Sequence, residues 1–252
     1  MDVPLSGADA VASAPNSADA VASAPNGADA VASAPSPNSV LQRVYDGIRH
    51  GIITGTIAQG TRLNENRFAE SFEVSRVPIR EAIRRLEHDG FVIAEPRRSA
   101  VVSTWTADRV IDLFDARLAL EVEAARYAAR RVREGASTAG LARRLAATEQ
   151  SIASGDHLEI AKASTQFHIE VVELTQNRLL RSLMRTISHE MIWLFYLTSQ
   201  RDARKACDEH HDMLDAIASG KEELARTVTY THIERGREPS LANFDRGGPG
   251  PA

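Results

Sequence analysis

The sequence predicts a mostly α-helical protein, in which an N-terminal winged helix-turn-helix precedes an antiparallel bundle of six to seven helices. Aromatic residues make up only 5% of the 252 residues, which argues against a β-sandwich. Apolar residues recur every three or four positions over most of 38–238, as in amphipathic helices. Two short runs at 91–94 and 100–104 interrupt this pattern and predict a β-hairpin after the third helix.

Composition divides the chain into four segments. Residues 6–35 are three copies of a ten-residue repeat, SGADAVASAP, NSADAVASAP and NGADAVASAP, which contain no aromatic and no large apolar residue. Such copies cannot build the core that a solenoid needs, so we expect a disordered tail over 1–37. A second disordered tail is expected over 239–252. The winged helix-turn-helix then spans 38–106 and the helical bundle spans 107–238.

The third predicted helix of the first domain concentrates positive charge. We expect helices at about 39–54 and 64–71, and a third that starts after Ser75 and ends near Gly90. The third carries four arginines within ten residues, at 76, 80, 84 and 85, in a chain of formal net charge −4. Pro78 falls in its first turn, where a missing backbone N–H costs little.

The phase of the third helix separates an apolar face from an arginine ridge. Ile79, Ala82, Ile83 and Leu86 follow the helical spacing and face a core, whereas Arg76, Arg80 and Arg84 lie on the opposite side. The nearby acids on this helix, Glu81 and Glu87, do not match each arginine. The ridge is therefore expected to be bare and to enter the major groove of DNA. The alternative is a solvated basic face, against which Arg97 and Arg98 at the hairpin tip argue, because a wing needs cations beside phosphate.

Three stretches carry a resemblance to a known family: IRHGIITGTIAQGTRLNENRFAE, VSRVPIREAIRRLEHDGFV and EPRRSAVV. They resemble the DNA-binding domain of GntR-type bacterial transcription regulators. The resemblance implies DNA contacts from the wing and from Glu65, Asn66, Arg67, Ser75, Arg76, Val77 and Arg80, to which the ridge adds Arg84. The wing turn of the family usually carries Gly where this chain has Ser99, at a cost of about 1 kcal/mol if that position needs a positive φ.

Three histidines of the second domain are expected to point inward. The predicted helices are 107–134, 138–153, 156–175, 177–200, 202–218 and 221–237, and by phase His168, His210 and His232 lie on or beside apolar faces of three of them. Imidazoles from three helices can bind Zn, Ni or Mn. The alternative is that each is a core histidine with a satisfied hydrogen bond.

A second resemblance bears on these histidines. The second half resembles the all-helical effector (FCD) domain of the FadR-like branch, whose metal-binding members carry D-x-x-x-H on one helix and single histidines on two later helices. This chain has STQFH at 164–168, EHHDMLDAI at 209–217 and THIERG at 231–236. The resemblance implies a divalent metal on His168, His210 and His232. Because Ser164 replaces the aspartate, the metal should be held more weakly, or with a water or an effector oxygen at that position.

Arg117 is a candidate effector-binding residue. It lies between Leu113 and Leu120 on the inward side of its predicted helix, where an unpaired charge is costly. It forms either an internal pair with Glu121 or a clamp for a carboxylate ligand. The R-x-x-x-E pattern of the resembled family supports the clamp.

The sequence also indicates a compartment. Cys207 is the only cysteine, so no internal disulfide can form, and the longest apolar run, MIWLFYL, is too short for a membrane span. No secretory signal is apparent. We therefore expect a cytoplasmic protein that does not contact a membrane. The resemblance implies a bacterial protein that joins the nucleoid when bound to DNA.

Together these patterns predict a homodimeric transcription regulator, in the simplest case a repressor of a metabolic operon. It would bind a palindromic operator in double-stranded DNA and be released by a small carboxylate effector. Two alternatives stay open: a regulator whose effector domain has lost its metal, and a helical metal-dependent enzyme. The enzyme lacks a glutamate in phase to act as general base, and it leaves the arginine ridge unexplained.

Overall fold

The computed structural model describes residues 37–94 and 99–244. The predicted repeat tail lies outside the described residues except at position 37, and residues 245–252 of the C-terminal tail lie outside as well. So do Arg97 and Arg98, whose contact with DNA stays a prediction.

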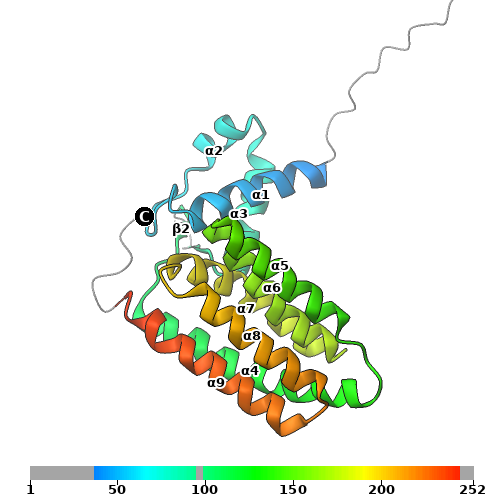
Figure 1. Cartoon of the computed structure of the whole chain (residues 1–252). Helices are drawn as coiled ribbons and strands as arrows, with labels where there is room; N and C mark the ends of the chain where they lie inside the picture. The colour runs from blue at the N-terminus through cyan, green and yellow to red at the C-terminus, as the bar shows by residue number, and fades with distance from the viewer. Residues whose placement is uncertain (1–36, 95–98, 245–252) are drawn as a thin grey trace, which may run out of the picture. The chain divides into compact units, whose positions relative to one another are not determined.

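The first domain is a winged helix-turn-helix, as predicted (Figure 1). Its elements are α1 (Pro37–Ile53), α2 (Glu65–Phe72), α3 (Arg76–His88), β1 (Val92–Ile93) and β2 (Val101–Val102). The strands pair antiparallel, with Val92 opposite Val102, and are shorter than the predicted runs. α2 begins where Asn64 Oδ1 accepts hydrogen bonds from the backbone N–H groups of Asn66 at 3.0 Å and Arg67 at 3.2 Å.

The apolar face of α3 fixes the direction of its arginines. Ile79, Ala82 and Leu86 are completely buried and belong to the same core as Val44 and Ile48 of α1. Burial of a leucine or isoleucine side chain stabilises the fold by roughly 1.5–3 kcal/mol. With that face packed inward, the arginine side of α3 is turned to solvent.

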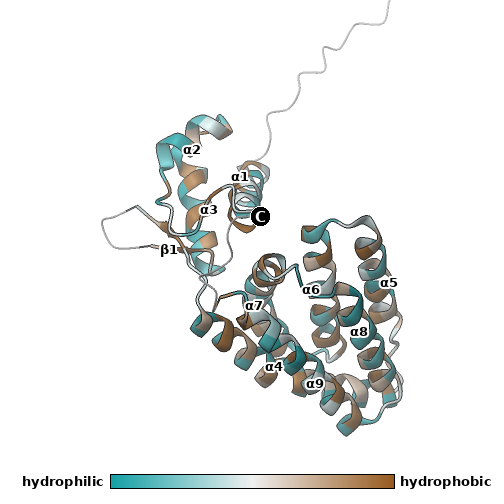
Figure 2. Ribbon diagram, turned by 60° about the vertical axis from the view of Figure 1, so that its left-hand side comes forward, coloured by the Kyte–Doolittle hydropathy of each residue, from teal (hydrophilic) through white to brown (hydrophobic). Residues whose placement is uncertain are grey.

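Residues 107–241 form the six helices of the bundle (Figures 1 and 2). They are α4 (Ala107–Arg133), α5 (Ala139–Ser154), α6 (His157–Leu174), α7 (Arg178–Leu197), α8 (Ala203–Ala218) and α9 (Glu222–Leu241). Figure 2 shows apolar and polar stretches alternating along these helices, as expected of amphipathic helices. α4 packs along α9, and α6 packs against both α5 and α7. Among the described residues, no helix has the length and apolar character that crossing a membrane requires.

The C-terminal helix is longer than the sequence indicated. α9 continues through Pro239 to Leu241, beyond the predicted boundary at 238. The buried side chain of Phe244 then contacts Trp105, with the ring centroids 6.3 Å apart. The predicted start of the C-terminal tail at 239 is therefore too early, because this packing holds residues up to 244.

The C-terminal end of α3 contacts α4 and α7. Arg109 donates a hydrogen bond to the carbonyl oxygen of Gly90 at 2.8 Å and another to Glu190 at 3.2 Å. Phe91 lies against Trp193 of α7, with the ring centroids 5.4 Å apart. The turn that follows α3 is thus held by side chains of the bundle.

Candidate functional site

The outer face of α3 presents the predicted DNA-binding side chains. The side chains of Arg76 and Arg80 are 54% and 50% exposed, and Arg84 on the next turn is exposed too. Val77 is 61% exposed, which is unusual for an apolar side chain and leaves it available for contact with a base methyl group. Ser75 caps α3 without a side-chain hydrogen bond to the helix.

The arginine ridge is not bare, which corrects the sequence-based expectation. Glu65 at the start of α2 accepts a hydrogen bond from Arg80 Nε at 2.8 Å and from Arg76 Nη2 at 3.2 Å. Burial alone would raise the pKa of Glu65, but the hydrogen bonds from the two guanidinium groups lower it overall. Each arginine keeps further N–H donors and remains half-exposed, so the pairing orients the ridge without covering it.

A concave surface lies beside this ridge. Its volume is about 670 Å³, and its lining includes Glu65, Asn66, Arg76, Arg80, Arg84 and Ser99. Arg67 is exposed on the first turn of α2. α2, α3 and the base of the wing therefore bring these predicted residues to one surface.

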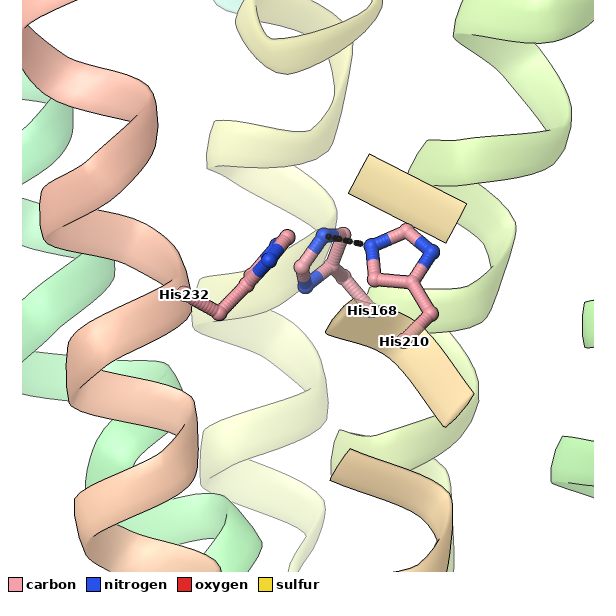
Figure 3. Close-up of side chains that lie close together, drawn as sticks. All are labelled: His168, His210 and His232. Atoms are coloured by element: carbon pink, nitrogen blue, oxygen red, sulfur yellow. Dashed lines mark hydrogen bonds between the residues drawn. The ribbon is translucent and has the colours of Figure 1, made fainter. Parts of the chain in front are cut away.

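The three predicted histidines converge inside the bundle (Figure 3). His168 of α6, His210 of α8 and His232 of α9 are buried, and each offers a ring nitrogen within 4.8 Å of those of the other two. Nε2 of His168 and Nε2 of His210 are 3.2 Å apart. The interior placement predicted from helical phase is correct for all three.

Two of these rings contact carboxylates through their other nitrogen. His168 Nδ1 lies 2.6 Å from Glu121 Oε2, and His232 Nδ1 lies 2.9 Å from Glu209 Oε2. A carboxylate at Nδ1 favours the tautomer that carries its proton there, so Nε2 is the nitrogen that bears the lone pair. Metal-binding histidines have this arrangement in proteins generally. The donor set therefore fits a divalent metal.

The surroundings keep the three imidazoles neutral, as a metal ligand must be. Burial lowers the pKa of His168 and holds that of His210 well below 6.5. Burial also lowers the pKa of His232 to about 4, even though its hydrogen bond to Glu209 opposes the shift. His210 Nδ1 is buried and has no hydrogen-bond partner among the described residues.

Arg117 and Glu121 form a buried pair next to the histidines. Arg117 Nε donates to Glu121 Oε1 at 2.7 Å, and Arg117 Nη2 lies 3.4 Å from His168 Nε2. Burial alone would raise the pKa of Glu121, but the positive charge of Arg117 and the contact with His168 lower it to about 2. Arg117 thus forms the internal pair considered from the sequence, and its Nη2 atom also reaches the histidine cluster.

A cavity of about 360 Å³ opens onto this cluster. Its lining includes Arg117, Ser164, His168, Phe195, Arg201 and His232. The structure therefore brings both predicted effector-binding residues, Arg117 and Ser164, to one cavity with two of the three histidines. A volume of this size suits a small organic ligand.

Sequence reasoning misses two charged residues of this site, Glu209 and Arg201, and one role of a third. It predicts Glu121 as a partner of Arg117 but not its contact with His168. Arg201 lies in a predicted break between helices, where phase gives no direction. The contacts of these residues run between helices, so helical periodicity carries little signal for them.

Comparison with known proteins gives two matched families. Residues 41–102 match the family described as bacterial regulatory proteins, gntR family, and residues 112–235 match the FCD domain. The HTH-type transcriptional regulator YdhC of Bacillus subtilis is 30% identical over 200 residues, which cover 78% of this chain and 89% of that protein. The gluconate operon transcriptional repressor of Bacillus subtilis is 40% identical over 79 residues, or 31% of this chain and 32% of that protein.

A solved structure agrees with both matches. A GntR transcriptional regulator from Rhodococcus sp. RHA1 superposes with a TM-score of 0.67 and 26% identity, covering 81% of this chain and 98% of that one. The likeness extends through both the winged helix-turn-helix and the helical bundle.

Proposed function

The chain belongs to the GntR family of bacterial regulatory proteins, with an FCD domain as its second half, and we propose that it represses an operon until a small carboxylate releases it. Its relatives are DNA-binding transcription regulators and not enzymes, which sets the metalloenzyme alternative aside. Repression is supported by the gluconate operon repressor, whose similarity covers the DNA-binding third of this chain.

The observation that carries the DNA-binding part is the arginine face of α3. Arg76 and Arg80 lie in its first two turns, where the residues of a recognition helix reach base edges. Guanidinium groups there can bond guanine through two N–H donors. We assign Ser75, Val77 and Arg84 to the same surface.

The start of α2 and the wing complete the proposed interface. Asn66 and Arg67 stand on the exposed first turn of α2, close to phosphates if α3 occupies the groove. Arg97 and Arg98 of the wing are assigned to phosphate or minor-groove contact. We propose that two copies bind as a homodimer, because two-fold symmetric regulators match palindromic half-sites.

The bundle cavity is the proposed effector site. Arg117 supplies N–H donors that suit a carboxylate, and Ser164 supplies a hydroxyl on the same cavity. His168, His210 and His232 would hold a zinc, nickel or manganese ion, which when bound supplies positive charge for a ligand oxygen. The residues of this chain orient that site, since Glu121 and Glu209 fix the ring tautomers.

Ser164 favours an alternative in which the effector site has lost its metal. A serine hydroxyl replaces the carboxylate expected there and adds no negative charge, which weakens metal binding, so the effector would be bound by the side chains alone. Metal analysis of the purified chain after loading with zinc or nickel decides between the two. A content below about 0.1 equivalents would remove the metal from the proposal and leave the regulator intact.

One experiment tests the function as a whole. An operator is first selected from random duplex DNA, and its binding is then followed by fluorescence anisotropy as small carboxylates are added. Release by at least one carboxylate, lost in Arg117→Gln with operator affinity unchanged, is the expected result. Operator binding that no carboxylate alters would refute the effector part, and failure to select any DNA sequence would refute the regulator.

A further inference from the structure

We propose that Arg201 is a second anion-binding residue of the bundle cavity, so that the effector carries two anionic groups, one held by Arg117 and the other by Arg201. The inference rests on the proposed function, because it assigns the chemistry of the ligand to the same cavity. It concerns a residue that neither the histidine cluster nor the arginine ridge requires.

Arg201 is a partly buried cation at the cavity wall. It lies between α7 and α8 and lines the cavity with Arg117. Its Nη1 donates to Ser240 Oγ at 3.3 Å, and no carboxylate of the described residues forms an ion pair with it. A guanidinium group in such a place is costly unless an anion joins it.

The positive charge of Arg201 is only partly compensated. Burial lowers the pKa of Arg201 to about 10, the nearby positive charge of Arg117 adds to that shift, and the negative charge of Glu209 opposes it without cancelling it. Arg117, by contrast, already has Glu121 as a partner at 2.7 Å. The surplus positive charge of the pair of arginines is therefore on Arg201.

The fold makes room for Arg201 at the cavity wall. Gly236 of α9 also lines the cavity, and a Cβ atom at that position would lie only 3.0 Å from Arg201 Nη2. An alanine at 236 would force the guanidinium group to shift by a few tenths of an ångström. The backbone of Gly236 does not have a positive φ that would require glycine, so the space that it leaves for Arg201 is the reason we give for glycine at this position.

Both guanidinium groups lie beside one aromatic ring. The Cζ atom of Arg117 is 5.1 Å from the centroid of Phe195, and the Cζ atom of Arg201 is 5.9 Å from it. Ile152 and Ile160 line the same cavity. A short carbon chain could therefore pack on apolar side chains while its two charged ends meet the two arginines.

Two anionic groups suit this arrangement better than one. A monocarboxylate bound at Arg117 leaves Arg201 without a counter-ion, whereas a dicarboxylate or a phosphorylated carboxylate neutralises it by a charge-assisted hydrogen bond. Dicarboxylates and phosphorylated carboxylates both carry two anionic groups. The experiment therefore includes a probe of each type.

The test measures affinity by isothermal titration calorimetry with the full chain. The dicarboxylates are succinate and glutarate, the monocarboxylates are butyrate and pentanoate of equal length, and the phosphorylated probe is 3-phosphoglycerate. For the wild type we expect a two-anion ligand to bind at least about tenfold more tightly than the monocarboxylate. Arg201→Gln should reduce that ratio to about twofold or less while monocarboxylate affinity is kept.

Three further variants guard against a folding artefact. Arg201→Lys keeps the charge and should restore part of the preference. Gly236→Ala keeps the arginine but crowds its guanidinium group, and should lower the preference by a smaller factor than Arg201→Gln does. Arg143→Gln makes the same charge change at an exposed position of α5 outside the cavity, and should leave the ratio unaltered. Circular dichroism checks that each variant is folded.

The outcomes separate this inference from the proposed function. If monocarboxylates bind as tightly as dicarboxylates, or if Arg201→Gln keeps the preference, Arg201 is not an anion site and the carboxylate regulator still stands. If only 3-phosphoglycerate shows the preference, the two-anion claim holds and the second group is a phosphate. If no probe binds at millimolar concentration, both the inference and the carboxylate effector fail.

Discussion

One oxygen of Glu65, Oε2, accepts hydrogen bonds from both Arg80 and Arg76, at 2.8 Å and 3.2 Å. The glutamate begins α2 and the arginines lie on the first two turns of α3, so the contact joins the two helices of the helix-turn-helix motif. Exposed pairs of this kind contribute only about 0–1 kcal/mol to stability. The pairing matters because it orients Arg76 and Arg80, the two side chains assigned to base contact.

Replacing Glu65 with Gln should separate affinity from specificity. The variant loses a negative charge beside the DNA surface, so binding to random duplex DNA should strengthen. The amide oxygen of Gln accepts weaker hydrogen bonds than a carboxylate does, so Arg76 and Arg80 are held less firmly and the ratio of operator to random-DNA affinity should fall. Anisotropy titrations with both DNAs at one salt concentration measure this ratio. An unchanged ratio would show that the pairing has no part in reading sequence.

Truncating either arginine should weaken specific binding. Arg76→Ala and Arg80→Ala should each cost about 1–3 kcal/mol of operator binding with the fold intact. Arg143→Gln, an exposed change in the bundle, serves as the matched control. Operator affinity equal to that of the wild type in either alanine variant would count against α3 as the recognition helix.

Introducing aspartate at position 164 should strengthen metal binding. Ser164 lines the cavity that opens onto His168 and His232, so Ser164→Asp adds a carboxylate ligand to a nitrogen-rich site. Zinc affinity, measured by competition with a chromogenic chelator, should rise by about tenfold or more. The same variant carrying His210→Ala should lose the gain. Equal affinity in the wild type and Ser164→Asp would place the metal elsewhere.

Glu209→Gln should have the opposite effect. Glu209 Oε2 lies 2.9 Å from His232 Nδ1 and fixes which ring nitrogen is free. Loss of such a carboxylate typically lowers metal affinity by about 10–100-fold. The chelator competition measures it, with Glu134→Gln as the control, because Glu134 pairs with Arg131 and belongs to no candidate metal site of the described residues. A reduction of equal size in both variants would point to a general loss of charge.

Thermal stability should fall as the pH drops below the normal pKa of histidine. Burial lowers the pKa of His189 from 6.5, and the positive Arg49 and Arg85 add to that shift against the opposing charge of Asp89. The unfolded chain therefore takes up a proton before the folded chain does. The contribution of neutral His189 to the free energy of unfolding is complete above about pH 6.5, and it is lost as the pH falls below that value.

His189→Gln removes one of these titrating groups, so its melting temperature should fall less steeply than that of the wild type between about pH 7 and pH 5. Buried His168, His210 and His232 contribute to the same slope in both proteins, since their pKa values are also lowered. Scanning calorimetry without added metal measures the two curves. Parallel curves would show that His189 does not contribute.

Helical phase was enough to place the elements and their inward faces. The apolar spacing of Ile79, Ala82 and Leu86 located the buried side of α3. The same spacing predicted that His168, His210 and His232 point into the bundle. Such predictions depend only on neighbours within one helix, whose relative directions are set by 3.6 residues per turn.

Tertiary packing decided the partners of these side chains. Glu65 reaches Arg76 and Arg80 from another helix, and Arg201 lies against a glycine 35 positions later, at 236. α9 passes Pro239, a residue that usually ends a helix, and Phe244 packs on Trp105. Spacing along one chain gives the direction of a side chain. The atom that it meets depends on how separate helices pack, and no local periodicity encodes that.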